Sequence, residues 1–262
     1  LTFIHVLAYQ LVWLKEHRDL KSVPSVAMLG VHLLALVGIY YKVSADMGSA
    51  LVYIFIFACV AFAAGVAIRW FVMGLLGGGI AFFLLWEYDK VSSYMKERFY
   101  VVFHHDYDPQ GVGWQQTRGL MALGGGKLTG EGYLHGTQTQ SSNAWSLPAR
   151  HTDFIFCTIG EELGMIGCLL ALALLTAIIV RCVLVARRAK SPLESYICVG
   201  IAAMLIFQTV INVGMCLFLV PVIGLTLPFF SYGGSSIVTL FLAMGMVSGI
   251  HKRTAPEWLR ER

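Results

Sequence analysis

The chain has 262 residues, of which 57% are hydrophobic and only 13% are charged, and its mean hydropathy is +0.71. Soluble domains carry about a quarter charged residues, so the composition excludes an ordinary soluble domain and indicates an integral membrane protein. The formal net charge of +4 is small and lies mostly near the ends of apolar runs, which favours membrane topology and no nucleic-acid partner.

Apolar runs of membrane-spanning length recur along the chain and predict an all-α, polytopic membrane bundle. Seven segments are predicted, at residues 1–14 (partial), 24–41, 48–68, 70–88, 154–186, 194–219 and 231–250. The 154–186 run exceeds the roughly 20 residues that cross a bilayer, so it must tilt or extend beyond the membrane. Because the chain starts with Leu1 inside an apolar run, we expect a fragment that lacks its N-terminus.

Basic residues in the short connections predict the orientation. Clusters around Lys15, Arg69, Arg187 and Lys252 all fall on one face when the segments alternate. The positive-inside rule makes this face, and with it the C-terminus, cytoplasmic. The large polar segment at 89–152, here called the long loop, is then extracytoplasmic.

The long loop is rich in glycine and has interleaved large apolar residues, such as Leu120, Leu128 and Tyr133. This mixture predicts a packed lid on the bundle rather than a disordered linker. The "GGGKLTG" stretch lacks the spacing of a phosphate-binding P-loop. The six cysteines have no CxxC pair and the histidines lack metal-ligand spacing, so no metal site is assigned.

Three acids lie at the start of the 154–186 run. Taken as a helix from Asp153, residues 153–171 have one face of small residues that would bury Asp153 against neighbouring helices. Spacing alone leaves Asp153 either a helix N-cap, a role that Thr152 also fits, or a catalytic base. Glu161 would lie about 12 Å deeper along the axis. The simplest interpretation of Glu161 and Glu162 is an ion pair or a protonated carboxyl that bridges helices.

Other polar residues occur at the ends of the predicted segments. Asp46 precedes the 48–68 segment, and Gln208 and Asn212 share one helix face, where interhelical hydrogen bonds are the simplest role. Prolines and glycines at 219–237 predict non-helical backbone at the membrane edge. The start of the last helix there favours a phosphate site, a hinge or a tight helix contact.

Five long motifs occur in a fixed order along the chain: "GVGWQ" (111–115), "GEGYLHGTQTQ" (130–140), "LPARHTDFIF" (147–156), "GEELGMIG" (160–167) and "GLTLPFFSYGGSS" (224–236). Together they resemble the SEDS proteins, the RodA, FtsW and SpoVE peptidoglycan polymerases of bacteria. "GTQTQ" and "RHTDF" are most similar to the elongation member RodA, whereas the last motif fits the division and sporulation members equally well.

The resemblance implies a ten-helix family fold of which this chain supplies about the last seven helices, as a single SEDS-type membrane domain over 1–262. It implies a glycosyltransferase in the bacterial cytoplasmic membrane that polymerises lipid II at the outer face, amid membrane lipids. The implied partner is a class B penicillin-binding protein. The missing helices carry family cavity residues, so the fragment alone is expected to be inactive.

The resemblance also implies roles for individual residues. Asp153, in the "HTDF" motif, matches the catalytic aspartate, and Asp46 matches the second acid of the family's cavity. Ala45, Met47, Ser49 and Ala149 depart from the family pattern, and an insert, "SSNAWS" (141–146), lengthens the approach to the motif. The remaining substrate-binding candidates are Trp114, Gln115, Arg118, Lys127, Arg150, His151, Thr152, Ser231, Gly233, Gly234 and Ser235.

As a general base, Asp153 would take a proton from the acceptor hydroxyl during a single inverting displacement, with a lipid pyrophosphate as leaving group. Arg118, Lys127 and Arg150 could neutralise the pyrophosphate, a role equally open to Mg²⁺ or Mn²⁺. Two rival functions fit the same sequence. A lipid II flippase would use Asp46, Glu161 and the broken helix as its pathway, and a scaffold for the penicillin-binding protein would not need Asp153.

Overall fold

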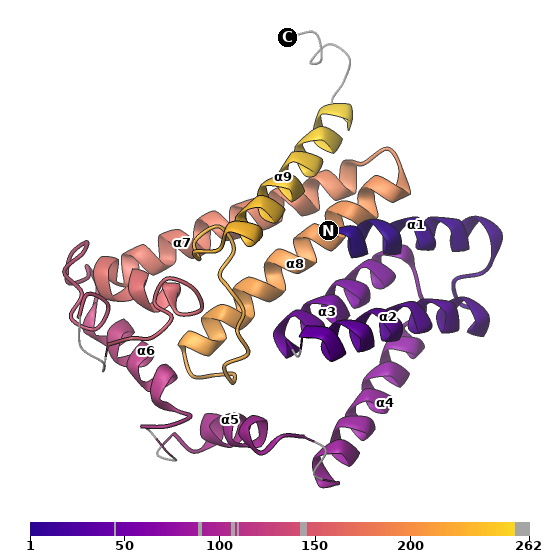
Figure 1. The fold of residues 1–262 in the computed structure, drawn as a ribbon. Coiled ribbons are helices and arrows are strands. Elements are labelled where there is room, and N and C mark those ends of the chain that lie inside the picture. The colour runs from indigo at the N-terminus through magenta and orange to yellow at the C-terminus, as the bar shows by residue number, and fades with distance from the viewer. Residues whose placement is uncertain (45, 89–90, 106–107, 109, 142–145, 255–262) are drawn as a thin grey trace. The chain divides into compact units, whose positions relative to one another are not determined.

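The computed structural model describes residues 1–44, 46–88, 91–105, 108, 110–141 and 146–254. Within these residues all regular secondary structure is helical, and nine helices are present (Figure 1). Their bounds are α1 Thr2–His17, α2 Val23–Ser44, α3 Met47–Ala64, α4 Ile68–Glu87, α5 Ser93–Phe103, α6 Trp114–Gly125, α7 Ile155–Arg188, α8 Pro192–Cys216 and α9 Gly234–Thr254.

Six of these helices, α2, α3, α4, α7, α8 and α9, are long and apolar enough to cross a membrane. The predicted all-α, polytopic membrane bundle is therefore confirmed, and each of the seven predicted segments is a helix. α1 has 16 residues and is too short to count among the candidate spans. The insert at 141–146 and the departure at residue 45 fall largely outside the described residues.

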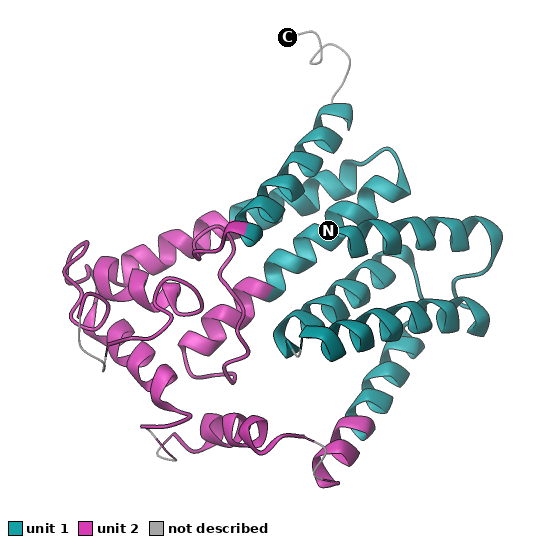
Figure 2. Ribbon diagram, in the orientation of Figure 1, with its two compact units in different colours: residues 1–80, 177–207, 235–262 teal, residues 81–176, 208–234 magenta. Residues whose placement is uncertain are grey.

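The chain forms two compact units (Figure 2). Unit 1 comprises Leu1–Ile80, Ala177–Phe207 and Ser235–Arg262, and unit 2 comprises Ala81–Thr176 and Gln208–Gly234. Unit 2 therefore contains the whole range of the long loop, the first part of α7, the end of α8 and the connection from α8 to α9.

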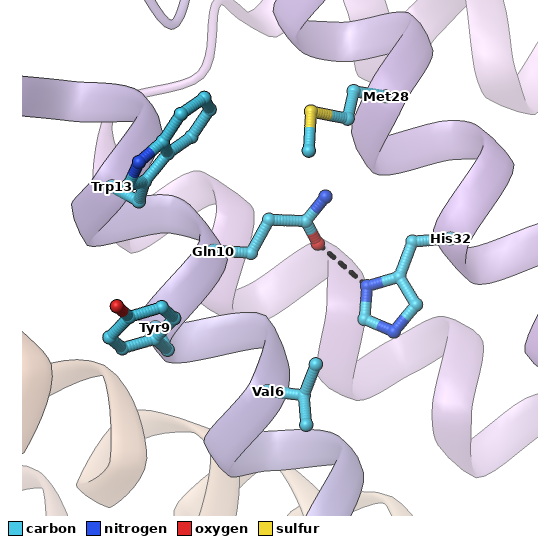
Figure 3. Close-up of a pocket in the computed structure, with 6 residues that line it drawn as sticks. All are labelled: Val6, Tyr9, Gln10, Trp13, Met28 and His32. Atoms are coloured by element: carbon cyan, nitrogen blue, oxygen red, sulfur yellow. Dashed lines mark hydrogen bonds between the residues drawn. The ribbon is translucent and has the colours of Figure 1, made fainter. Parts of the chain in front are cut away.

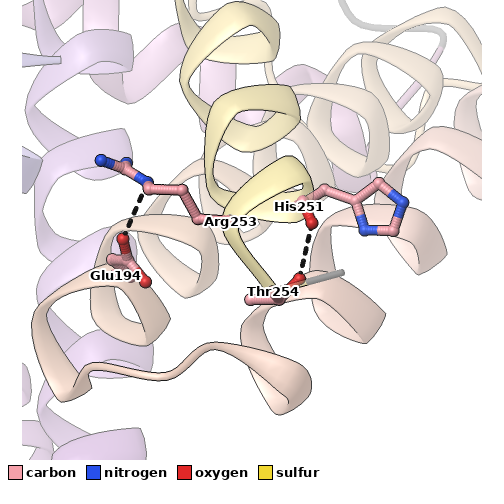
Figure 4. A network of polar contacts seen from close by, with 4 residues as sticks. All are labelled: Glu194, His251, Arg253 and Thr254. Atoms are coloured by element: carbon pink, nitrogen blue, oxygen red, sulfur yellow. Dashed lines mark hydrogen bonds and ion pairs between the residues drawn. The ribbon is translucent and has the colours of Figure 1, made fainter. Parts of the chain in front are cut away.

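Unit 1 is built on the packing of α1, α2 and α3. The buried side of α1 repeats at intervals of three and four residues, as in Leu7, Leu11 and Leu14, which is the spacing of one helix face. In the same unit, the Arg253 guanidinium near the end of α9 lies 3.2 Å from the Glu194 carboxylate at the start of α8 (Figure 4). Arg253 is 68% exposed and Glu194 is 18% exposed, and ion pairs near the surface contribute little to stability.

The prediction of a lid packed by the interleaved apolar residues is wrong in its residues, because Leu120, Leu128 and Tyr133 are 46%, 59% and 71% exposed. In unit 2 the long loop is packed instead through small residues and its backbone. It contains α5 and α6, and the buried side of α6 includes Gly119 and Ala122. A Cβ on Gly119 would lie 3.0 Å from Cys157 Sγ, so α6 closely approaches the first turn of α7. The small-residue face of α7 is thus buried by a helix of the loop.

The prediction of a continuous helix over 153–171 is wrong. α7 begins at Ile155 and is broken at Gly164, whose φ of 67° and ψ of −167° are non-helical. This conformation is open to glycine but not to residues with a Cβ. Because α7 begins at Ile155 and not at Asp153, Glu161 lies less deep along the helix axis than the sequence predicts. The connection between α8 and α9, residues 217–233, is non-helical, as its prolines and glycines predict.

Candidate functional site

Asp153 lies in a tight turn that leads into α7. The helix begins two residues later, at Ile155. The amides of Thr152 and Phe154 both donate to the carbonyl of Ala149, at 3.0 and 3.1 Å, and Ala149 has a positive φ of 51°. Phe154 directly precedes the helix. The interpretation of Thr152 or Asp153 as the N-cap therefore loses its support.

Three successive carbonyls of this turn, at residues 151–153, are held by donors from beyond the turn. Tyr232 N donates to the carbonyl of residue 151 at 2.7 Å, and Ser231 Oγ donates to that of residue 152 at 2.7 Å. Asn212 Nδ2 donates to that of residue 153 at 2.8 Å. Consecutive backbone hydrogen bonds of this kind leave a segment little conformational freedom. The turn that carries Asp153 is therefore fixed through its backbone.

Asn212 and Ser231 also bind the connection between α8 and α9. Asn212 is 0% exposed, and its Nδ2 donates to Leu225 O at 2.7 Å in addition to the turn. Ser231 Oγ accepts a hydrogen bond from Leu227 N at 2.7 Å. The predicted role of Asn212 as a bond between helices is thus corrected, because its partners are backbone carbonyls of a turn and of a connection.

The Asp153 carboxylate lies close to the bend at Gly224. A Cβ on Gly224, where φ is +75°, would lie 3.9 Å from Asp153 Oδ2. Asp153 is half-buried and Gly224 is exposed. A polar reactant can therefore approach the carboxylate from the side of this bend.

At the break in α7, the long loop supplies the hydrogen bonds that the helix lacks. In an unbroken helix, the amides of residues 165 and 166 would bind the carbonyls of residues 161 and 162. Instead, Met165 N donates to Lys127 O at 2.9 Å and Ile166 N to Leu128 O at 3.2 Å. The two carbonyls accept from the amides of residues 131 and 132, at 2.9 and 3.1 Å. The loop backbone is thus inserted into the helix backbone.

This close approach requires glycine in the loop. A Cβ on Gly126 would collide with Gly160 O, and a Cβ on Gly130, at φ +81°, would collide with Glu162 O. The glycine-dense sequence of the loop therefore has a structural cause, which is backbone contact with α7.

The carboxylates of Glu161 and Glu162 are buried, at 0% and 5% exposure, and point into the same loop. Their hydrogen-bond partners lie in residues 134–140. The prediction of an ion pair or of a bridge between helices is therefore corrected: among the described residues, their donors are amides and hydroxyls of the loop.

The three predicted loop cations differ in their surroundings. Arg150 Nη1 donates to Thr139 O and, at 3.5 Å, to Ser141 O, so this guanidinium is tied to the loop backbone. Arg118 Nη1 lies 3.4 Å from Gln138 Oε1, a weak contact. Lys127 is exposed at a positive φ of 48°.

The other predicted residues are divided between the units. Trp114 and Gln115 are half-buried at the start of α6, and His151 is exposed beside Arg150, whose Nε lies 3.2 Å from His151 Nε2. Gln208 is half-buried on α8. Gly233 lies before α9 and Gly234 is its first residue.

Asp46 and Ser235 belong to unit 1. Asp46 is the N-cap of α3: Oδ1 accepts from Ser49 N at 3.2 Å, and Ser49 Oγ donates to Oδ2 at 2.6 Å. Ser49, which departs from the family pattern, thus provides a second donor to this carboxylate.

Sequence reasoning missed Gln116 and Arg98, which both hold the connection after α8. Gln116 is 2% exposed, and its Nε2 donates to Met215 O at 3.0 Å and Val220 O at 2.8 Å. Arg98 Nη1 donates to Val222 O. A helical reading of 114–125 would have revealed Gln116, because it shares the buried side of α6 with Gly119.

Unit 1 contains a separate apolar recess of about 450 Å³ between α1 and α2, in which His32 Nδ1 and Gln10 Oε1 lie 2.6 Å apart (Figure 3). Its lining residues are Val6, Tyr9, Gln10, Trp13, Met28 and His32. None of these was predicted as a site residue. In the described part of the chain, no three His, Cys, Asp or Glu side chains are grouped to hold a metal ion, and the divalent cation stays a prediction.

Comparison with known sequences gives consistent matches. The family model of the FtsW, RodA and SpoVE cell cycle proteins matches residues 1–255. The chain is 36% identical over 186 residues to the peptidoglycan glycosyltransferase MrdB of Escherichia coli K12, over 70% of this chain and 49% of MrdB. It is 32% identical over 260 residues to a probable peptidoglycan glycosyltransferase FtsW of Geobacter sulfurreducens, over 97% of this chain and 66% of that protein.

Solved structures are similar as well. One, described as a peptidoglycan synthase complex that coordinates polymerization and crosslinking, gives a TM-score of 0.78 at 28% identity, over 97% of this chain and 68% of the other. The rod shape determining protein RodA of Thermus thermophilus gives 0.58 at 27% identity, over 95% and 64%. The chain spans about half the length of MrdB, so it corresponds to only part of such a protein.

Proposed function

The chain belongs to the SEDS family of FtsW, RodA and SpoVE proteins, and from this premise we propose that it is part of a peptidoglycan glycosyltransferase that polymerises lipid II. The observation that carries the proposal is the setting of Asp153. Its carboxylate is half-buried next to the exposed bend at Gly224, and its turn is fixed by three successive carbonyl hydrogen bonds. A general base needs this combination of access and fixed position.

In the proposed reaction, Asp153 accepts the proton of the acceptor sugar's 4-hydroxyl as that oxygen attacks the anomeric carbon of the donor. The bond from the anomeric carbon to the lipid pyrophosphate breaks, and the pyrophosphate leaves with the electron pair. The configuration inverts, so one displacement and one base suffice. Glycoside hydrolysis differs, because it uses two carboxylates.

The leaving pyrophosphate needs positive charge but no proton donor. Among the predicted cations, Arg118 and Lys127 support this role best, because Arg150 is engaged with Thr139 and Ser141. A bound Mg²⁺ or Mn²⁺ would supply the same charge neutralisation. Trp114 and Gln115 stay candidate sugar contacts.

The remaining candidates are placed differently. His151 and Thr152 directly precede Asp153, and their carbonyls accept hydrogen bonds that fix the turn. Thr152 Oγ1 donates to Ala149 O at 3.3 Å, so the exposed His151 is the better candidate for a substrate contact. Ser231 is buried and its hydroxyl is bonded to Thr152 O and Leu227 N, so Gly233, Gly234 and Ser235, at the start of α9, are the better candidates. Asp46 is the second acid implied by the family motif.

We place the activity at the outer face of the bacterial cytoplasmic membrane, with the long loop outside and the C-terminus in the cytoplasm. Residues 1–262 would form a single SEDS-type domain. The solved relative described as a peptidoglycan synthase complex supports a class B penicillin-binding protein as the partner. Because the chain is about as similar to MrdB, at 36%, as to an FtsW, at 35%, the lean towards RodA rests on the "GTQTQ" and "RHTDF" motifs.

The decisive experiment is polymerisation of lipid II by the purified full-length protein, with Asp153→Asn as the variant. General base catalysis contributes about 10²- to 10⁴-fold, so the variant should lose polymer formation to that extent and keep its folded helical content. Full polymerisation by the variant would refute the role of Asp153. Lipid II transport without any polymer would instead support a flippase, and dispensability of Asp153 in a functional complex would support a scaffold.

A further inference from the structure

We propose that Glu161 and Glu162 are positioning residues for glycosyl transfer: they fix segment 131–141 of the long loop and, through it, Arg150 and the turn that carries Asp153. We call Glu161, Glu162 and their partners in this segment the carboxylate clamp. The catalytic consequence rests on the proposed function, whereas the attachment of the loop can be measured without any activity.

Glu161 uses both carboxylate oxygens on the backbone of the loop. Oε1 accepts from Gln138 N at 2.6 Å, and Oε2 accepts from Thr139 N at 2.8 Å. Thr137 Oγ1 adds a longer contact of 3.3 Å to Oε1. Two backbone amides on one carboxylate are charge-assisted and set the direction of the peptide chain as well as its distance.

Glu162 holds the same segment through three further donors. Its Oε2 accepts from Leu134 N at 3.1 Å, and its Oε1 accepts from Gln140 Nε2 at 2.5 Å and Thr139 Oγ1 at 3.3 Å. Since the two glutamates are adjacent, one site on α7 holds both ends of the 134–140 bend. The loop supplies only donors here, which is the chemistry that a buried carboxylate requires.

The break at Gly164 makes this arrangement available. It frees the carbonyls of Glu161 and Glu162 from their own helix, and these carbonyls accept from Glu131 N at 2.9 Å and Gly132 N at 3.1 Å. Each glutamate therefore binds the loop twice, once through its carbonyl and once through its carboxylate. A role in packing alone would not require hydrogen bonds from both the backbone and the side chain of each glutamate.

The clamped segment leads directly to the proposed base. Thr139 O and Ser141 O accept from Arg150 Nη1, and Thr158 Oγ1 donates to Arg150 O at 2.9 Å. Arg150 is three residues before Asp153. Loosening the segment therefore removes the support on one side of the Asp153 turn, and a displacement of about 1 Å in an active site costs about 10²-fold in rate.

The test compares Glu161→Gln and Glu162→Gln with wild type in the full-length protein, reconstituted in lipid nanodiscs. An amide in place of a carboxylate presents an N–H₂ to at least one loop donor, so hydrogen exchange of amides in 127–141 should rise at least about tenfold. With lipid II as substrate, kcat should fall about 10²-fold, whereas KM should change less than about threefold. Glu87→Gln is the matched control, because Glu87 is exposed at the end of α4 and lies outside segment 127–141.

A second variant reaches the clamp from the loop and leaves both carboxylates in place. A Cβ on Gly136 would lie 2.6 Å from Glu161 Oε2 and would also collide with Thr139 Oγ1. Gly136→Ala should therefore raise exchange in the same segment and lower kcat. Gly124→Ala is its control, because a Cβ there meets nothing within 4 Å. If a glutamate variant fails to fold, Gly136→Ala alone decides.

Unchanged protection of 127–141 in the glutamate variants would overturn the clamp, and so would lost protection with full kcat. A fall confined to KM would also overturn it, because that pattern indicates lost substrate binding. Asp153→Asn separates the two proposals: it should lose polymerisation and keep the protected loop. Polymer formation by Asp153→Asn would refute the proposed base and leave the exchange result on the clamp standing.

Discussion

Two sets of acidic residues in unit 2 are held in opposite ways. In the turn at 151–153, neighbouring groups donate to backbone carbonyls, and the Asp153 carboxylate lies at an exposed bend. In the clamp, the carboxylates of Glu161 and Glu162 are themselves bound by loop donors and are buried. The backbone contacts of the turn fix the position of Asp153 itself, whereas the carboxylate contacts of the clamp fix another segment.

The largest expected effect on these contacts is that of Gly164→Ala, which places a Cβ at the break in α7. The native φ and ψ at Gly164 cost a residue with a Cβ about 1–3 kcal/mol, and the new Cβ would lie 2.5 Å from Leu128 O. We expect the free energy of unfolding in detergent to fall by about 3 kcal/mol. Exchange should rise at Met165 and Ile166.

Gly245→Ala in α9 is the control, because a Cβ there meets nothing within 4 Å. It should change stability by no more than about 1 kcal/mol, in the stabilising direction. Equal stability of Gly164→Ala and wild type would show that the loop is not needed to complete α7.

Asn212→Ala tests whether the turn is fixed through its backbone. The change leaves the carbonyls of Asp153 and Leu225 without their buried donor, which should cost about 2 kcal/mol of unfolding free energy and lower kcat about tenfold. Gln208→Ala, half-buried one turn earlier on α8, should cost less than about 0.5 kcal/mol. Loss of stability with unchanged kcat would contradict the role of Asn212 in placing Asp153.

Ser231→Ala removes one bond to Thr152 O and one from Leu227 N. We expect a loss of about 1 kcal/mol in denaturant unfolding and a smaller fall in kcat than in Asn212→Ala, because the Asp153 carbonyl keeps its donor. Ser248→Ala, exposed on α9, is the reference. A larger fall than in Asn212→Ala would reverse the order of importance within the turn.

Glu194→Gln should have the smallest effect. It removes the ion pair with Arg253 in unit 1, in which Arg253 is exposed, and such surface pairs contribute about 0–1 kcal/mol. Thermal unfolding and polymerisation should both stay close to wild type. A large loss of activity would show that charge in unit 1 matters as much as the acids of unit 2.

The sequence predicts the helices well because apolar runs and their charged ends are local features. All seven segments are helices, although α8 ends at Cys216 and α9 begins at Gly234, three residues inside the predicted bounds. The non-helical connection between them follows from its prolines and glycines. The prominence of Asp153 follows from the "HTDF" motif.

The contacts of the long loop could not be predicted. Gly164 lies in an apolar run with other small residues, so it is typical of close helix packing, and only the backbone of residues 127–132 makes it a break. Glu161 and Glu162 were assigned partners on other helices for the same reason. Three of their donors, Leu134 N, Gln138 N and Thr139 N, are backbone amides, which have no signature in the identity of the loop residues.

The break also decides which part of α7 needs to lie in the membrane. From Met165 to Arg188 the helix is about 36 Å long at 1.5 Å per residue, and the hydrocarbon core of a bilayer is about 30 Å thick. The part beyond Gly164 can therefore cross the lipid by itself. The first turns of α7, with both glutamates and the inserted loop, can stand in the aqueous boundary above it, so the two carboxylates need not be carried into hydrocarbon.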